Sequence, residues 1–193
     1  MGNTPEPNWR SVQKEGNIEV REYAPMIVAE VVTTGERYKA INDGFRILAA
    51  FIFGENSVQQ KIEMTAPVTQ QAEQASSEKI AMTAPVTQEK TDNDNEWKVR
   101  FVMPEEYTIA TLPKPNDKRI RILEVPAYET AVIRFSGFNT DKNVATHERA
   151  LKTWLEKNNI KTVGEPTYAF YNPPWTPPFM KRNEVMIRIA TRR

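Results

Sequence analysis

The sequence predicts one α+β domain, in which antiparallel strands form a sheet curled towards a barrel and two helices cover it from outside. Two stretches, 38–52 and 144–155, place apolar residues at helical spacing. Short segments with alternating apolar and polar residues precede and follow each stretch. Because the order strands, helix, strands occurs twice, we expect two halves of similar plan related by a pseudo-twofold axis.

Charge and composition exclude several classes of protein. The 193 residues include 26 basic and 25 acidic side chains, and a net charge of +1 gives no basic field that favours nucleic acid. Since the chain contains no cysteine, disulfides, thiolate catalysis, zinc–thiolate sites and iron–sulfur clusters are excluded. The single histidine, His147, excludes a histidine-rich metal site.

The sequence also lacks signals for a membrane. No apolar run reaches the roughly 18 residues that a membrane span needs, and the polar residues 1–8 contain no apolar signal core. We therefore expect a soluble cytoplasmic protein and favour a monomer. A targeting peptide removed before this chain begins is compatible with the sequence.

The first half begins with residues 1–17, which are predicted to be an irregular lead-in to a single domain over 18–193. Ile18–Tyr23 and Ile27–Val32 are predicted strands, either antiparallel neighbours or one long strand broken at Ala24-Pro25. A helix follows, and its predicted core stripe is Tyr38, Ile41, Phe45, Leu48 and Ile52.

An internal repeat follows this helix. Residues 61–70 and 79–88 read KIEMTAPVTQ and KIAMTAPVTQ and differ at a single position. Each copy is predicted to be a short strand stopped by a turn at Ala-Pro. Met64 and Met82 could line a ligand surface, since thioethers adapt to flat aromatic partners. The alternative is a tandem duplication that provides two packed strands.

The second half repeats the plan. The segment 97–103 is a predicted strand, because apolar residues alternate with Lys98 and Arg100 along it. The segments 120–125, with Ile120, Ile122 and Val125, and 128–138, which follows Pro126, are predicted to be two further strands. Asn139-Thr140-Asp141 offers N-cap residues for a second helix that runs to about Asn158 and carries His147. Strands over 167–171 and 183–190 complete the domain.

Between these last two strands lies the segment 171–182, which we call the arm. Two Pro-Pro pairs flank Trp175, and Phe179, Met180, Lys181 and Arg182 follow. Proline restricts its own φ and the preceding residue, so the arm is stiff. It could form the wall of a site for a flat, apolar, anionic ligand, cover the edge of the core, or act as a PxxP ligand for a partner.

Several motifs together carry a resemblance to a known family. The arm, Glu22-Tyr23, the segment Lys61–Val68 and Asn183-Glu184-Val185 resemble those of the SOUL family of haem-binding proteins, in particular its plant, algal and bacterial branch with two MTAPV segments. The resemblance runs from Ile18 to Ile189. It implies a distorted antiparallel eight-stranded β-barrel flanked by two helices, built from two related halves and similar to bacterial GyrI-type effector-binding domains.

The resemblance also implies a ligand and its site. The ligand is haem (non-covalent, b-type) or another tetrapyrrole, held in a surface groove between the first helix and the loop before the last strand. Apolar side chains would cover the ring, and cations would meet its propionates. The residues of this chain that the resemblance places there are Arg37, Ile41, Phe45, Arg46, Met64, Tyr171, Trp175, Phe179, Met180, Lys181 and Arg182.

An axial ligand for haem iron is harder to assign. Some family members have a proposed axial histidine near the first helix, but residues 38–53 contain none here. His147 on the second helix is the remaining candidate for a metal ligand. Its structural alternative is a partly buried histidine with a hydrogen-bond partner.

The expected function is therefore reversible binding of a tetrapyrrole for carriage or buffering, without catalysis. No Gly-rich phosphate loop, HExxH motif or nucleophile elbow is present. Two alternatives remain open. One is an enzyme that modifies a tetrapyrrole, and the other is an effector-binding or protein-interaction module of the GyrI-like type.

Overall fold

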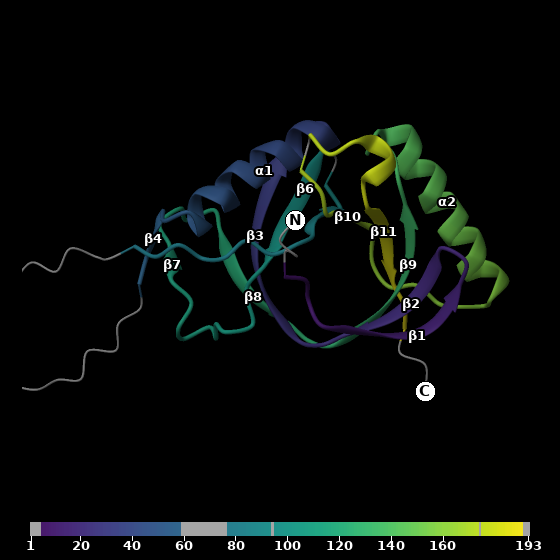
Figure 1. Ribbon diagram of the computed structural model, residues 1–193, viewed down its shortest axis with the longest axis horizontal. Coiled ribbons are helices and arrows are strands. Elements are labelled where there is room, and N and C mark those ends of the chain that lie inside the picture. Colours follow the sequence, from purple (N-terminus) through teal and green to yellow (C-terminus); the bar gives the residue numbers. More distant parts are fainter. Residues whose placement is uncertain (1–4, 59–76, 94, 174, 191–193) are drawn as a thin grey trace, which may run out of the picture.

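A strongly curled antiparallel sheet forms the body of the protein, and both helices lie on its outer face (Figure 1). The structure, a computed structural model, describes residues 5–58, 77–93, 95–173 and 175–190. Its elements in chain order are β1 (Trp9–Glu15), β2 (Ile18–Tyr23), β3 (Met26–Thr34), α1 (Arg37–Ile52), β4 (Asn56–Ser57), β5 (Val86–Lys90), β6 (Glu96–Val102), β7 (Lys114–Pro115), β8 (Arg121–Val125), β9 (Tyr128–Phe135), α2 (Asp141–Lys157), β10 (Thr167–Phe170), the 3₁₀ helix η1 (Pro178–Met180) and β11 (Asn183–Arg188).

Nine of the described strands form one sheet in the order β1-β2-β9-β11-β10-β5-β6-β3-β8, and β4 and β7 form a small second sheet. The predicted α+β class with two helices is confirmed, but the predicted count of eight strands is wrong. The extra strand is β1, which lies in the stretch predicted to be an irregular lead-in and pairs with β2. Alternation failed to reveal β1 because this edge strand is exposed along nearly its whole length.

The two halves repeat the same arrangement. In the first half, β3, α1, β5 and β6 place their strands in the order β3-β6-β5, and in the second half β9, α2, β10 and β11 give β9-β11-β10. The halves meet where β5 pairs with β10. The strand that precedes each half in the chain pairs with the other half. Strand β2 precedes the first half and pairs with β9 of the second, whereas β8 precedes the second half and pairs with β3 of the first.

This pseudo-twofold relation is visible in the sequence at a fixed offset of 102 positions, from 18–35 to 120–137. Along it, Ile18 matches Ile120, Glu22 matches Glu124, Ala29 matches Ala131 and Gly35 matches Gly137. Gly35 and Gly137 both have positive φ, 119° and 99°, in the turns that lead to α1 and α2. The same exchange of strands explains why β2 and β3, predicted as possible antiparallel neighbours, are not paired with each other.

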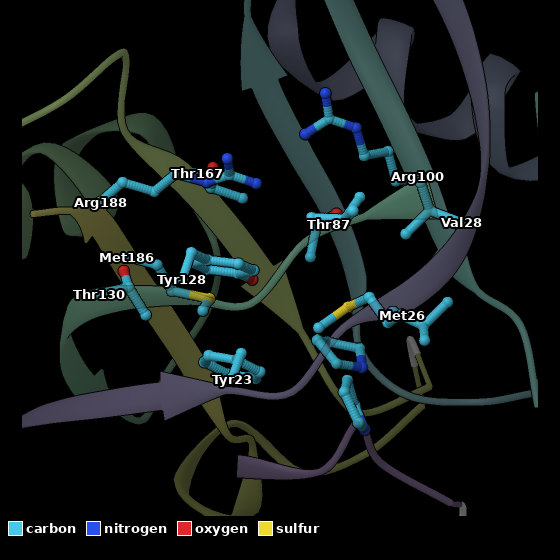
Figure 2. Close-up of a pocket in the computed structure, with 14 residues that line it drawn as sticks. Tyr23, Met26, Val28, Thr87, Arg100, Tyr128, Thr130, Thr167, Met186 and Arg188 are labelled. Atoms are coloured by element: carbon cyan, nitrogen blue, oxygen red, sulfur yellow. The ribbon is translucent and has the colours of Figure 1, made fainter. Parts of the chain in front are cut away.

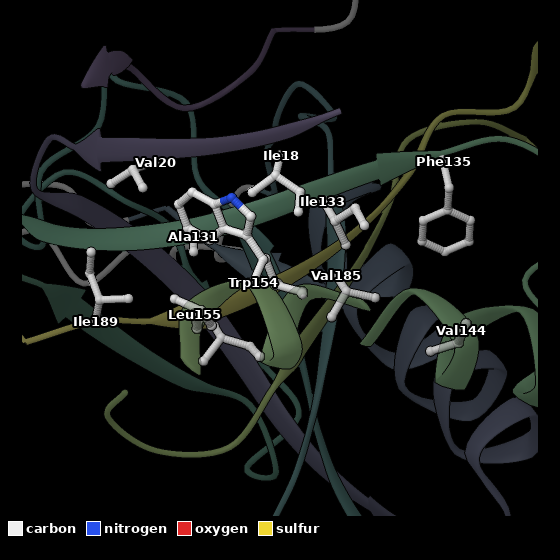
Figure 3. Close-up of a cluster of buried hydrophobic side chains, with 12 residues drawn as sticks. Ile18, Val20, Ala131, Ile133, Phe135, Val144, Trp154, Leu155, Val185 and Ile189 are labelled. Atoms are coloured by element: carbon white, nitrogen blue, oxygen red, sulfur yellow. The ribbon is translucent and has the colours of Figure 1, made fainter. Parts of the chain in front are cut away.

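Each helix packs one apolar face onto its own half of the sheet. The side of α1 that carries Leu48 and Phe51 packs on β6, where Gly44 leaves so little room that an added Cβ would lie 2.6 Å from Val99 Cγ2. On α2, Leu151 and Leu155 pack on β9 and β11 (Figure 3). The buried side chains of these two clusters form the core, so the helix positions follow from the apolar periodicity.

One copy of the internal repeat can be placed. The first copy, with Met64, lies outside the described residues. In the second copy, Ile80 is buried in the cluster under α1, and the strand β5 begins after Pro85. The predicted stop at Ala-Pro is therefore wrong for this copy, because the residues after the proline hydrogen-bond to β6 on one side and to β10 on the other.

Candidate functional site

The arm carries a group of apolar side chains that face solvent. Trp175 is 82% exposed, Phe179 is 79% exposed and Met180 is 52% exposed. Phe138, in the loop between β9 and α2, is 58% exposed, and the Lys181 ammonium lies 5.5 Å from its ring centroid. We call Phe138, Trp175, Phe179 and Met180 the aromatic platform. Large apolar side chains grouped on a surface in this way mark sites of binding.

Hydrogen bonds donated by backbone N–H groups hold the arm in place. The Arg182 N–H donates to the Asn172 side chain over 2.6 Å, which closes the base of the arm. Further along, the Gly137 N–H donates to the Pro178 carbonyl over 2.8 Å and ties η1 to the loop before α2. Since prolines already restrict the arm in the unfolded chain, presenting its exposed rings costs little additional entropy.

The N-terminal ends of both helices meet beside the arm (Figure 1). Arg37, the first residue of α1, forms a 2.6 Å ion pair with Asp141, the first residue of α2, and also donates to the Asn139 carbonyl. Tyr38, 64% exposed, is in the first turn of α1, at the end that the arm crosses. Phe45 lies seven residues further along, about 10 Å down the helix axis, with its ring edge-on to Phe101.

A buried network of charges supports the base of the arm from inside the sheet. Glu184 on β11 is fully buried and accepts two hydrogen bonds from Arg21 on β2, at 2.9 and 3.1 Å. It also accepts from the Tyr171 hydroxyl at 2.7 Å and from Arg182 at 3.0 Å. The Arg182 guanidinium stacks on the Tyr171 ring at 3.8 Å, so both ends of the arm are joined to one carboxylate.

These contacts shift the ionisation of the groups involved. Burial and the Glu184 carboxylate raise the pKa of Tyr171, so its phenol stays protonated and donates. Burial acts to lower the pKa of Arg21, but hydrogen bonds and charge attraction from Glu184 outweigh it and raise that pKa. Arg21 and Tyr171 therefore stay protonated near neutral pH, and the contacts that they make with Glu184 support the arm.

His147 lies on α2, half-buried, with its ring stacked on Phe135 at a centroid distance of 4.0 Å. Its Nδ1 is 2.8 Å from the Asn143 carbonyl oxygen. Because a carbonyl oxygen only accepts, Nδ1 must carry the proton and donate. Across the described ranges, no three His, Asp or Glu side chains come together in a way that could hold a metal ion.

Comparison with known proteins then decides the family. The family model described as SOUL heme-binding protein matches residues 4–77 and 70–188, which is most of the chain. The chain belongs to the SOUL family. A mouse protein named Heme-binding protein 2 is 25% identical over 189 residues, which cover 94% of this chain and 84% of that protein. The human protein of the same name is 26% identical over 175 residues, covering 87% and 78%.

Among solved structures, the C-terminal domain of EcmrR has a TM-score of 0.62 to this SOUL protein at 10% sequence identity. The match covers 90% of this chain and 96% of that domain, and it shows a shared fold. In the part of this SOUL chain that the structure describes, no helix combines the length and the apolar character needed to cross a membrane.

The structure distributes the predicted site residues over several environments. Trp175, Phe179, Met180 and Lys181 come together on the arm. By contrast, Ile41 is buried in the core under α1, and Arg37 is buried against Asp141. Phe45 and Arg46 lie on the exposed side of α1. Tyr171 and Arg182 belong to the buried Glu184 network. Met64 lies outside the described residues. Their role towards a ligand stays a prediction.

Two residues of this surface were not among the predicted site residues. Tyr38 was predicted to be core because it continues the apolar stripe of α1, but it precedes the part of the helix that packs on the sheet. Phe138 lies in a loop, where periodicity carries no information. Its position directly after Gly137 was a signal that this residue lies in a turn before a helix, because Gly137 corresponds to Gly35 in the turn before α1.

Burial of Tyr23, which stacks on Tyr128 inside the curled sheet, raises the pKa of Tyr23 to about 12 from its ordinary value of 10.0. The folded protein favours the neutral phenol of Tyr23. This preference contributes in full to the free energy of unfolding below pH 10, and the contribution is lost as the pH rises towards 12. The difference corresponds to about 2–3 kcal/mol. Urea unfolding at about pH 9 and about pH 11.5 should show this loss in the wild type.

Tyr23→Phe should lose about 2 kcal/mol less than the wild type over the same pH interval, since it has no phenol at this position to ionise. Tyr38→Phe is the matched control, because it removes the hydroxyl of a tyrosine that is 64% exposed instead of one that is buried. An equal alkaline loss in Tyr23→Phe and in the wild type would contradict this account.

Proposed function

We propose that this SOUL protein reversibly binds haem or a related tetrapyrrole on the aromatic platform and the adjoining N-terminal turn of α1, for carriage or buffering. The observation that carries the proposal is the exposure of Trp175 and Phe179, at 82% and 79%, on an arm that prolines and hydrogen bonds hold in place. A tetrapyrrole offers these rings a flat apolar face to cover.

Cations beside the platform suit the propionates of such a ligand. Lys181 lies over the ring of Phe138, and Arg46 is exposed on α1. Arg37 and Arg182 are less suited than expected from the resemblance, since each is already bound to a carboxylate of the protein. We assign the propionate contacts to Lys181, because of its place beside the platform, and to Arg46, because it is exposed on α1.

The platform favours exchangeable binding. It is an open surface, and burying a ring on one side gains only part of the apolar contact that an enclosed pocket would provide. Cysteine is absent, so a thioether attachment of haem is not available. His147 is half-buried and stacked on Phe135, a position that suits packing on β9 better than axial ligation. Non-covalent binding in the micromolar to submicromolar range fits carriage or buffering.

A haemin titration followed by Soret absorbance tests the proposal. The wild type should saturate at one equivalent, and His147→Ala should give the same Soret maximum and an affinity within about twofold. Absence of a saturable shift in the wild type would contradict haem binding. Loss of the shift in His147→Ala alone would move the site to α2. Bleaching of the Soret band with release of a product under turnover would instead support the tetrapyrrole-modifying alternative.

A further inference from the structure

A second feature that can accommodate a ligand lies inside the curl of the sheet, on the face opposite the helices (Figure 2). Its cavity volume is about 50 Å³, room for roughly four water molecules and far too small for a tetrapyrrole. It shares no lining residue with the predicted haem site. Fourteen residues line the hollow, among them Tyr23, Met26, Arg100, Tyr128, Met186 and Arg188.

Two arginines line this hollow, and their environments differ. The Arg100 guanidinium is held by two carboxylates, Glu30 at 2.7 Å and Glu89 at 2.9 Å. The guanidinium carbon of Arg188 lies over the ring of Tyr128, 4.2 Å from its centroid. Within the described residues, no carboxylate lies within ion-pair distance of Arg188 and no side-chain hydrogen bond is formed by it.

Stacking leaves the hydrogen-bonding edge of Arg188 available. A guanidinium has five N–H donors in its plane, and a ring that covers its face contacts none of them. In Figure 2 the Arg188 side chain crosses above the Tyr128 ring and ends near Thr167. Thr130 and Thr167 add hydroxyl groups to the same wall. Their hydrogen bonds within the protein, to the Ala131 carbonyl and to Glu89, are long, at 3.4 and 3.5 Å. A planar carboxylate is the natural partner for this fork of donors.

The apolar side chains that line the hollow determine which group the ligand can carry beside its carboxylate. Met26 and Met186 place thioethers, and Val28 and Val125 place methyl groups, around the same space, while none of the fourteen lining residues is acidic. Thioethers and aromatic rings pack well on compact apolar groups. The N-terminal segment closes one side, since Pro7 lines the hollow and the Ala84 N–H donates to the Pro5 carbonyl.

We propose that this hollow is a binding site for a small monocarboxylate with a compact apolar body, with Arg188 as the residue that holds the carboxylate. The apolar body contacts the methionine and valine side chains. This site is separate from the aromatic platform, and it recognises a ligand of different size and charge distribution from a tetrapyrrole.

NMR of protein labelled at the methionine methyl groups tests the site directly, with acetate as the probe, because its four heavy atoms match the volume of the hollow. Acetate should bind saturably, with a Kd in the millimolar range. Its binding should shift the methyl signals of Met26 and Met186 and leave those of Met103, in the core under α1, and Met180, on the arm, in place. Acetamide, which lacks the charge, should bind at least tenfold more weakly.

Arg188→Gln should weaken acetate binding at least tenfold and leave haemin binding unchanged. Arg134→Gln on β9 is the matched control, since Arg134 is exposed and outside the hollow, and it should bind acetate as the wild type does. Thr130→Val, which keeps the volume and removes a hydroxyl, should weaken binding about threefold even if Arg188→Gln folds poorly. Shifts at Met180 alone, equal affinity for acetamide, or wild-type affinity in folded Arg188→Gln would each overturn the proposal.

Discussion

Replacing Glu184 with glutamine should lower the free energy of unfolding by about 3–5 kcal/mol, the usual result of removing one charge from a buried ion pair. The change leaves the guanidinium of Arg21, whose side chain is 4% exposed, without its bidentate partner. It also removes the carboxylate that accepts from Tyr171 and Arg182. Urea unfolding followed by circular dichroism measures the difference.

Glu22→Gln is the matched control for this prediction. Glu22 pairs with Arg10 at the surface, where the two side chains are 36% and 76% exposed, and such pairs contribute about 0–1 kcal/mol. If Glu184→Gln cost no more than Glu22→Gln, the Glu184 network would not be buried from water as the structure has it. Addition of Arg21→Gln to Glu184→Gln should recover part of the loss, because it removes a buried charge that has only Glu19 left as a carboxylate partner among the described residues.

The double change Trp175→Ala with Phe179→Ala should weaken haemin binding about a hundredfold, because two rings that are now exposed would lose their contact with the ligand. The free energy of unfolding should change by less than about 0.5 kcal/mol for each site, since neither ring is packed in the core. A Soret titration gives the affinity, and urea unfolding of the same samples gives the stability.

Phe53→Ala provides the control for the aromatic platform. Phe53 is 59% exposed, like the platform residues, but lies at the far end of α1, about 24 Å along the helix axis from Arg37. Its removal should leave haemin affinity unchanged. Equal affinities of the double variant and the wild type would place the ligand elsewhere, whereas equal losses in the double variant and Phe53→Ala would indicate non-specific adsorption to exposed rings.

Much of the fold could be predicted because periodicity reports burial. The strand that carries Val99 alternates, and the helices show apolar residues at helical spacing, so the existence and type of these elements follow. The edge strand β1 was not predicted, because its side chains are exposed along nearly the whole strand and give no buried face for alternation to reveal. Strand order could not be read from local pattern, since it depends on which segments exchange between the halves.

The candidate site was predictable only where its residues are unusual in themselves. The proline-flanked Trp175 stands out in the sequence, and the arm does present it to solvent. Burial of Arg37 and the pairing of Arg182 with Glu184 depend on partners far along the chain, and no spacing rule reveals them. The hollow around Arg188 could not be predicted from the sequence for the same reason, because its lining residues come from many separate strands.

The exchange of β2 and β8 has a consequence for how the protein unfolds. Each half takes its outer strand from the segment that precedes the other half, so neither half contains all the hydrogen-bond partners of its own sheet. A half released alone would expose an unpaired strand edge and part of its core, which favours aggregation. We therefore expect the two structural halves to unfold together as a single cooperative unit, despite an internal symmetry that resembles two domains.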